Sequence, residues 1–218
     1  MWCEMKYFIS NITNRKFLKG IAIFMLGQAV GYYSIKLFLT DYHIIGSQID
    51  NSIPFVPHMI YFYSLFYLYI FFTLYYIFIK DYNNYKKGII IGTIIYIIAD
   101  IIFLIYPTIM IRPEVAYDKL DWLTAFLVKT TYTYDNPASN CFPSIHCLFC
   151  FQVIIMTIML KNVKWTNKAL IIIIGLLISI STVFVKQHYL YDVIGALILS
   201  ITMNTLGYVY FNKIIKSS

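Results

Sequence analysis

Long apolar runs constrain this chain more than any other feature of its sequence. Several stretches contain few charges and reach roughly 20 residues, which is enough to cross a hydrocarbon layer about 30 Å thick. Of the 218 residues, 60% are apolar or aromatic and only 12% are charged, and this composition lies outside the range of soluble domains. We therefore predict an all-α integral membrane protein.

The apolar runs predict six transmembrane helices in one bundle. The expected spans are Phe17 to Leu39, Phe55 to Ile79, Gly88 to Ile111, a fourth that starts near Pro143, Lys168 to Val185, and Tyr189 to Phe211. Residues 1–16 are expected to form an interfacial arm with a basic end. The middle of the polar segment after the third span, Val115 to Val128, is expected to be a short amphipathic helix on the membrane surface. The sequence has no internal repeat, so we expect residues 1–218 to form a single domain.

Basic residues predict the orientation of the bundle. Twelve of the 17 Lys and Arg residues fall at the termini and in the loops after the second and fourth spans: Lys6, Arg15, Lys16, Lys19, Lys80, Lys86, Lys87, Lys161, Lys164, Lys168, Lys213 and Lys216. Because cytoplasmic segments carry an excess of Lys and Arg, we expect both termini to be cytoplasmic. The net charge of +7 is then a topology signal, and we expect no nucleic-acid partner.

The stretch from Ser181 to Asp192, STVFVKQHYLYD, is the first candidate for chemistry. His188 and Asp192 are four residues apart, a spacing that places two side chains on one face of a helix. A hydrogen bond between them would fix the imidazole tautomer and leave the second ring nitrogen free to act as a nucleophile or base. The alternative is a histidine that bonds to its neighbour for stability alone.

Three polar clusters share the outer side in this topology, and together they indicate a phosphate site. They are Arg112-Pro113, the segment from Asn140 to His146, and the segment from Ser181 to Asp192. We expect Pro143 in the first turn of a helix, whose free amides and positive dipole end favour an anion. The candidate anion-binding groups are the side chains of Arg112, Ser144, Ser181, Thr182 and Lys186.

Two other groups have competing interpretations. Cys141, His146, Cys147 and Cys150 have the residue types of a zinc site, but the last two fall inside an apolar helix and no second ligand pair completes the set. We therefore expect no metal. Asp100 lies within the third span, where a carboxylate is costly. It either lines a substrate path or bonds to Gln28 or Asn204 within the bundle.

The three clusters resemble the motifs of the type 2 phosphatidic acid phosphatase superfamily. The matches are Pro143-Ser144-Ile145-His146 in full, Ser181, His188 and Asp192 at the spacing of the third motif, and Arg112-Pro113 at the end of the first. The resemblance covers about residues 88–211. Two positions depart from the family pattern, because Ile105 stands where a lysine is expected and Thr182 where an arginine is expected.

Three features resemble the branch that contains inositol phosphorylceramide synthases and their bacterial relatives: the Ser181-Thr182 start, the His188-Tyr189 pair and the Tyr106-Pro107-Thr108 run ahead of Arg112-Pro113. Members of that branch transfer a phospho-headgroup between lipids. We expect Lys186, one helical turn after Thr182, to replace the missing arginine as a point charge.

The resemblance implies a membrane enzyme that acts on a lipid phosphate without a cofactor. It implies His188 as the nucleophile, Asp192 as the group that orients it, and His146 as the acid that protonates the leaving oxygen. Hydrolysis of a lipid phosphate or pyrophosphate and transfer of a phospho-headgroup both remain open. A non-enzymatic protein that binds or transports an anionic lipid is the alternative from another class. The expected location is a bacterial plasma membrane, with the active site facing outward.

Overall fold

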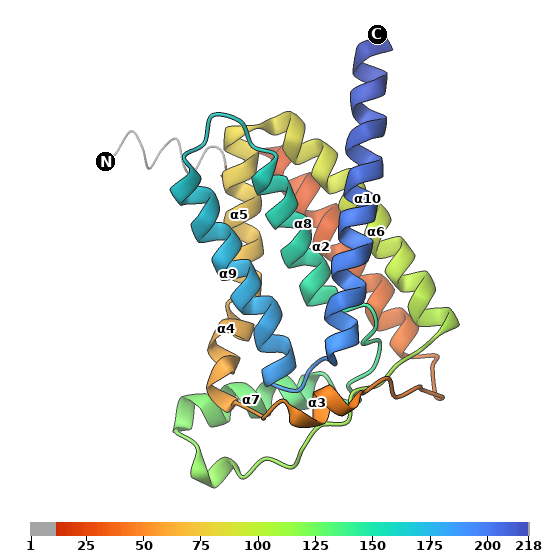
Figure 1. The fold of residues 1–218 in the computed structure, drawn as a ribbon, viewed down its shortest axis with the longest axis vertical. Helices are drawn as coiled ribbons and strands as arrows, with labels where there is room; N and C mark the ends of the chain where they lie inside the picture. The colour runs from red at the N-terminus through yellow and green to blue at the C-terminus, as the bar shows by residue number, and fades with distance from the viewer. Residues whose placement is uncertain (1–11, 218) are drawn as a thin grey trace.

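Long helices make up most of the described chain, residues 12–217 of the computed structural model (Figure 1). Five of them are long and apolar enough to cross a membrane. They are α2 (Arg15–Lys36), the η1–α4–α5 unit (Pro57–Met59, Ile60–Ser64 and Phe66–Lys80), α6 (Tyr82–Ile105), α9 (Trp165–Phe184) and α10 (Leu190–Ser217). The prediction of an α-helical membrane protein is thus confirmed. The expected fourth span is α8 (Ile145–Ile158), which has 14 residues and is shorter than the others.

The remaining helices lie at one end of the bundle, called the loop end here. They are α3 (Gln48–Ser52), η2 (Tyr117–Lys119) and α7 (Trp122–Tyr134), which lies across the bundle at the bottom of Figure 1. The predicted surface helix therefore exists but begins later than Val115. Asp121 caps it, because its carboxylate accepts a hydrogen bond from the backbone N–H of Thr124 at 3.0 Å. Most of the expected arm, residues 1–11, lies outside the described residues.

Loops at this end are tied to one another through their backbones. His43 pairs with Thr108 and Ile109 pairs with Ser139 in isolated β-bridges, and the described residues contain no strand. The N–H of Met110 donates to the carbonyl of Ala138 at 2.8 Å. These bonds bring the segment after α6 against the segment before α8, so two of the three polar clusters meet here.

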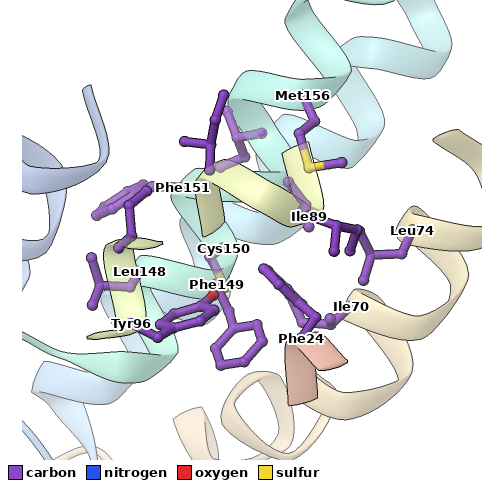
Figure 2. Packing of buried hydrophobic residues seen from close by; sticks show 14 of the residues in the cluster. Phe24, Ile70, Leu74, Ile89, Tyr96, Leu148, Phe149, Cys150, Phe151 and Met156 are labelled. Atoms are coloured by element: carbon purple, nitrogen blue, oxygen red, sulfur yellow. The ribbon is translucent and has the colours of Figure 1, made fainter. Parts of the chain in front are cut away.

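The centre of the bundle is α8. Eleven of its 14 residues are buried, and it packs against α5, α6, α9 and α10. Figure 2 shows its Phe149 beside Phe24 and Tyr96, with Leu148, Cys150 and Phe151 directed to other sides of the helix. Because apolar neighbours surround α8, its N-terminal end is held in a fixed position at the loop end.

Polar groups inside the bundle mostly bond to each other. Asn204 Nδ2 donates to Gln152 Oε1 at 2.7 Å and to the carbonyl of Ser200 at 2.8 Å. Asn204 is therefore not the partner that we expected for Asp100. The Asp100 side chain lies against Gly31 of α2, and its Oδ1 has no hydrogen-bond partner within the described part of the chain.

Candidate active site

The loop between α9 and α10 presents His188 at the loop end. Its Nδ1 lies 3.2 Å from Asp192 Oδ2, so the expected contact is present. His188 precedes α10 and does not share a helix with Asp192, contrary to our prediction. The same carboxylate oxygen accepts a hydrogen bond from the backbone N–H of Tyr189 at 2.8 Å. A single oxygen of Asp192, Oδ2, thus both binds the backbone at the start of α10 and orients the imidazole of His188.

His146 faces His188 from the first turn of α8. The two ring centroids are 5.9 Å apart. The His146 ring packs against the rings of Tyr63 and Phe66, with centroids 4.7 and 4.6 Å away. Its Nδ1 is buried and has no hydrogen-bond partner among residues 12–217. Aromatic packing therefore sets the position of His146, whereas a carboxylate sets the position of His188.

Ser144 is the N-cap of α8. Its hydroxyl oxygen accepts a hydrogen bond from the N–H of Cys147 at 3.3 Å, and its own N–H donates to the carbonyl of Asp192 at 3.1 Å. Pro143 consequently precedes the cap, and the prediction that it occupies the first turn was wrong. Serine is preferred at this position because its short side chain satisfies a free amide. The residue links the start of α8 to the start of α10, and so sets the spacing of the two histidines.

Arg112 reaches the site from the segment after α6. Its Nη1 donates to the carbonyls of Tyr132 and Asp135, and its Nη2 donates to Asp135 Oδ2 and to Gln187 Oε1, both at 2.6 Å. The guanidinium also lies over the Tyr132 ring, 4.5 Å from its centroid. Gln187 directly precedes His188, so Arg112 is anchored beside the nucleophile candidate.

Three other predicted phosphate ligands point elsewhere. Lys186 Nζ donates to the carbonyls of Asp50 and Ile53, at 2.9 and 2.7 Å, and burial lowers the pKa of this ammonium. The hydroxyls of Ser181 and Thr182 are fully buried and donate to backbone carbonyls of α9. None of the three lines the cavity described next, and Lys186 is held away from the position of the missing arginine.

A cavity of about 430 Å³ joins these groups. His146, His188, Gln187 and Asp135 form part of its wall. Most of the rest comes from α2, α4, α5 and α7 and is rich in tyrosine, with Tyr32, Tyr33, Tyr63, Tyr67 and Tyr134; the segment before α8 and the first turns of α8 complete the wall. Both candidate histidines thus face one space, whose lining combines apolar rings with hydroxyl groups.

Asp135 and two of its partners, Tyr32 and Lys36, were not identified as site residues from the sequence. The Asp135 carboxylate accepts hydrogen bonds from Tyr32 Oη at 3.1 Å, from Lys36 Nζ at 3.0 Å and from Arg112 Nη2 at 2.6 Å. Tyr32 and Lys36 are 103 and 99 positions away from Asp135. No spacing rule connects residues so distant, and no motif of the sequence includes them.

Cys141 is the other group near the His–Asp pair. One ligand atom each from Cys141, His188 and Asp192 lie within 4.8 Å of one another, whereas Cys147 Sγ is directed at Ser179 and Thr182. The zinc set considered from the sequence is therefore not the group that converges. Burial raises the pKa of the Cys141 thiol well above its usual range, and Sγ donates to the carbonyl of Ala138 at 3.1 Å.

The order and spacing of these groups along the chain also permit a comparison with known families. Residues 110–216 match the model of the PAP2 superfamily. The matched segment contains Arg112, His146, His188 and Asp192, and it supports assignment of the chain to this superfamily. The match does not resolve the inositol phosphorylceramide synthase-like branch. Searches among curated proteins and among solved structures gave no match.

Proposed function

We propose that this protein is a membrane-embedded lipid phosphatase that hydrolyses a lipid phosphate or pyrophosphate through a phosphohistidine intermediate. One observation carries the proposal: His188, oriented by Asp192, faces His146 across a cavity within the helical bundle. The match of residues 110–216 to the model of a superfamily of phosphatases and phosphotransferases supports an enzymatic role on lipids in a bilayer.

The position of the cavity supports a lipid substrate. At the end remote from the loops, Phe17 of α2 contacts Phe71, Tyr75 and Phe78 of α5. Toward the loop end the cavity lies between the two helices, from Met25 to Tyr33 on one side and from Tyr63 to Tyr67 on the other. We propose that a lipid enters sideways from the bilayer through this gap and brings its phosphate to the histidines.

In the first step, His188 Nε2 attacks phosphorus while the bond from phosphorus to the lipid oxygen breaks. Asp192 accepts a hydrogen bond from Nδ1–H and stabilises the positive ring as it forms. His146 donates a proton to the departing oxygen. Arg112 stabilises the charge on the phosphoryl oxygens from the side of Gln187.

In the second step, the oxygen of a water molecule attacks phosphorus and the N–P bond breaks. The electron pair returns to His188 Nε2, and His146 accepts a proton from the water. A lipid alcohol in place of water would convert hydrolysis into transfer of the phosphoryl or phospho-headgroup. The proposed steps use only side chains of this chain.

Positive charge at the end opposite the loops supports an orientation with both termini cytoplasmic and the site outward. Lys80, Lys86, Lys164 and Lys168 all lie at that end, which is also where α2 begins and α10 ends (Figure 1). A location in a bacterial plasma membrane remains a proposal based on the family resemblance.

Phosphate release by the purified protein in detergent tests the function. The assay uses a panel of lipid phosphates and pyrophosphates with EDTA present, and a parallel series adds diacylglycerol or ceramide as acceptor. Release that disappears in His188→Ala, together with an acid-labile phosphoprotein in the wild type, is the expected result. A lipid product that carries the headgroup would indicate transfer. Lipid binding without turnover of any substrate would favour the non-enzymatic alternative.

A further inference from the structure

A cluster of three charges lies beside the cavity. Asp135 lines the cavity and forms ion pairs with Lys36 and Arg112, and of the three only Arg112 belongs to a sequence motif. Asp135, at the end of α7, lies 3.0 Å from Lys36 Nζ and 2.6 Å from Arg112 Nη2. The side chains of Lys36 and Arg112 are each 11% exposed, and that of Asp135 is 29% exposed. Both cations are therefore partly withdrawn from solvent, where an ion pair is screened less than at an open surface.

Lys36 determines the net charge of this cluster. Two positive groups and one negative group sum to +1, whereas Arg112 and Asp135 alone would sum to zero. A neutral pair attracts a phosphate weakly, but a cluster with net positive charge beside low-dielectric walls concentrates anions. The ammonium on α2 thus gives the charge cluster beside the cavity a net attraction for phosphate.

Both cations retain donors for another oxyanion. An ammonium carries three N–H groups, and within the described chain the hydrogen bond of Lys36 goes to Asp135. Arg112 Nε is buried and has no partner among the described residues. Arg112 is also bonded to Gln187, so the cluster connects directly to the residue before His188. Asp135, Gln187 and His188 line the same cavity.

No cation comes from the position at which the first motif carries a lysine. Ile105, the last residue of α6, is 77% exposed and apolar. Lys186 is turned toward the carbonyls of Asp50 and Ile53. The Lys36 ammonium shares with Arg112 the carboxylate of Asp135, and Asp135 lines the cavity.

We propose that Lys36 is a phosphate-binding residue of this site: it and Arg112 hold the phosphoryl oxygens, and Asp135 keeps the two cations together. The inference rests on the proposed function, because the phosphate is that of the substrate, but it assigns the role to a helix outside the three motifs.

Inorganic phosphate is the probe, with purified full-length protein in detergent. Two constants are measured: Ki for inhibition of lipid phosphate hydrolysis, and Kd from the rise in melting temperature with phosphate concentration. Lys36→Gln keeps a donor to Asp135 and removes the charge, and Lys36→Arg restores the charge. Lys19→Met, an exposed lysine on the same helix, is the matched control.

We expect Lys36→Gln to raise Ki and Kd for phosphate about tenfold, as removal of one charged hydrogen-bond partner does. Lys36→Arg should stay near the wild type, and Lys19→Met should match it. Asp135→Asn, which raises the cluster charge to +2, should lower both constants. The phosphate constants should thus rise in Lys36→Gln and fall in Asp135→Asn. If the Lys36–Asp135 ion pair only holds α2 against α7, both variants should instead lose the same amount of melting temperature.

Unchanged phosphate constants in a folded Lys36→Gln protein would overturn the inference. So would equal weakening of phosphate binding in Lys36→Gln and Lys19→Met. Failure of the proposed function gives a different result, because a wild type without turnover still yields a Kd from the melting series. If Lys36→Gln does not fold, the inference is tested by the phosphate Ki and Kd of Lys36→Arg, which should stay near the wild type, and of Asp135→Asn, which should fall.

Discussion

Asp192→Asn tests how the nucleophile candidate is oriented. Asp192 Oδ2 accepts hydrogen bonds from His188 Nδ1–H and from the backbone N–H of Tyr189. Its Oδ1 is buried without a hydrogen-bond partner in the described chain. An asparagine that keeps the Tyr189 bond must place its amide oxygen at the Oδ2 position. The same oxygen then still accepts a hydrogen bond from Nδ1–H, and the imidazole keeps the tautomer required for attack. The first orientation places the NH₂ at the unpartnered Oδ1 position, but a turned amide sets its NH₂ against the N–H of Tyr189 and leaves that backbone donor unpaired as well, at a cost of about 1–3 kcal/mol.

The expected effect on rate follows from the change in one hydrogen bond. A bond to a charged group contributes about 1.5–3 kcal/mol and a neutral one about 0.5–1.5 kcal/mol, so the exchange costs about 1–2 kcal/mol. This corresponds to a loss of about 5- to 30-fold in the rate of phosphohistidine formation. Asp192→Ala, which removes the acceptor, should lose more.

Single-turnover formation of the acid-labile phosphoprotein measures this rate, and thermal melting in detergent confirms that each variant is folded. A serine protease triad loses about 10⁴-fold on the equivalent change, because its asparagine favours the wrong tautomer. A loss of that size in folded Asp192→Asn protein would refute the argument that the Tyr189 N–H fixes the amide.

Four further outcomes are expected. His146→Ala should lose about 10²- to 10⁴-fold on a lipid phosphate and much less on an aryl phosphate with a good leaving group, and equal losses on both would argue against a proton donor. Lys186→Ala should lower the melting temperature and leave KM unchanged, because its Nζ bonds to carbonyls near α3, and a higher KM at an unchanged melting temperature would instead indicate phosphate binding. Burial would raise the pKa of Asp50, but hydrogen bonds from Ser47 and Leu190 outweigh it and hold the pKa below its usual value. Its contribution to stability is therefore complete above about pH 4 and is lost as the pH falls through the folded pKa, so Asp50→Asn should flatten the decline of melting temperature below about pH 4. A cysteine introduced near Lys86 should be protected from an impermeant thiol reagent in intact cells, whereas one near Asp121 should react, and the reverse pattern would invert the proposed orientation.

Helix boundaries show what hydropathy can and cannot predict. The third span was expected from Gly88 to Ile111, whereas α6 runs from Tyr82 to Ile105. The start was missed because the first turns of α6 are polar, although Asp81 caps them by accepting from the N–H of Asn84. The end was predictable, since Tyr106 precedes Pro107 and a residue before proline avoids the helical region. Local capping and proline rules would have corrected both ends.

The candidate site could also be predicted only in part from the sequence. Motif spacing brought His146, His188 and Asp192 into one hypothesis. The structure places the two histidines at one cavity and Asp192 in contact with His188. Side-chain direction did not follow from spacing, because Lys186 has a φ of 52° that turns it toward α3. The contacts of Asp135 join α2, the segment after α6 and the end of α7. Such contacts depend on how the whole bundle packs, which a single sequence does not specify.

The shortness of α8 sets the depth at which the chemistry takes place. At about 1.5 Å per residue its 14 residues span about 21 Å, and the 20 residues of α9 span about 30 Å. Lys168 of α9 bonds to the carbonyls of Ile158 and Leu160, so the two helices are level at one end and α9 extends beyond α8 at the other. The first turn of α8, which carries His146, therefore stops short of the far end of α9. A substrate phosphate must sink toward the hydrocarbon layer to reach His146, and headgroups too large or too strongly hydrated to descend should be excluded whatever their acyl chains.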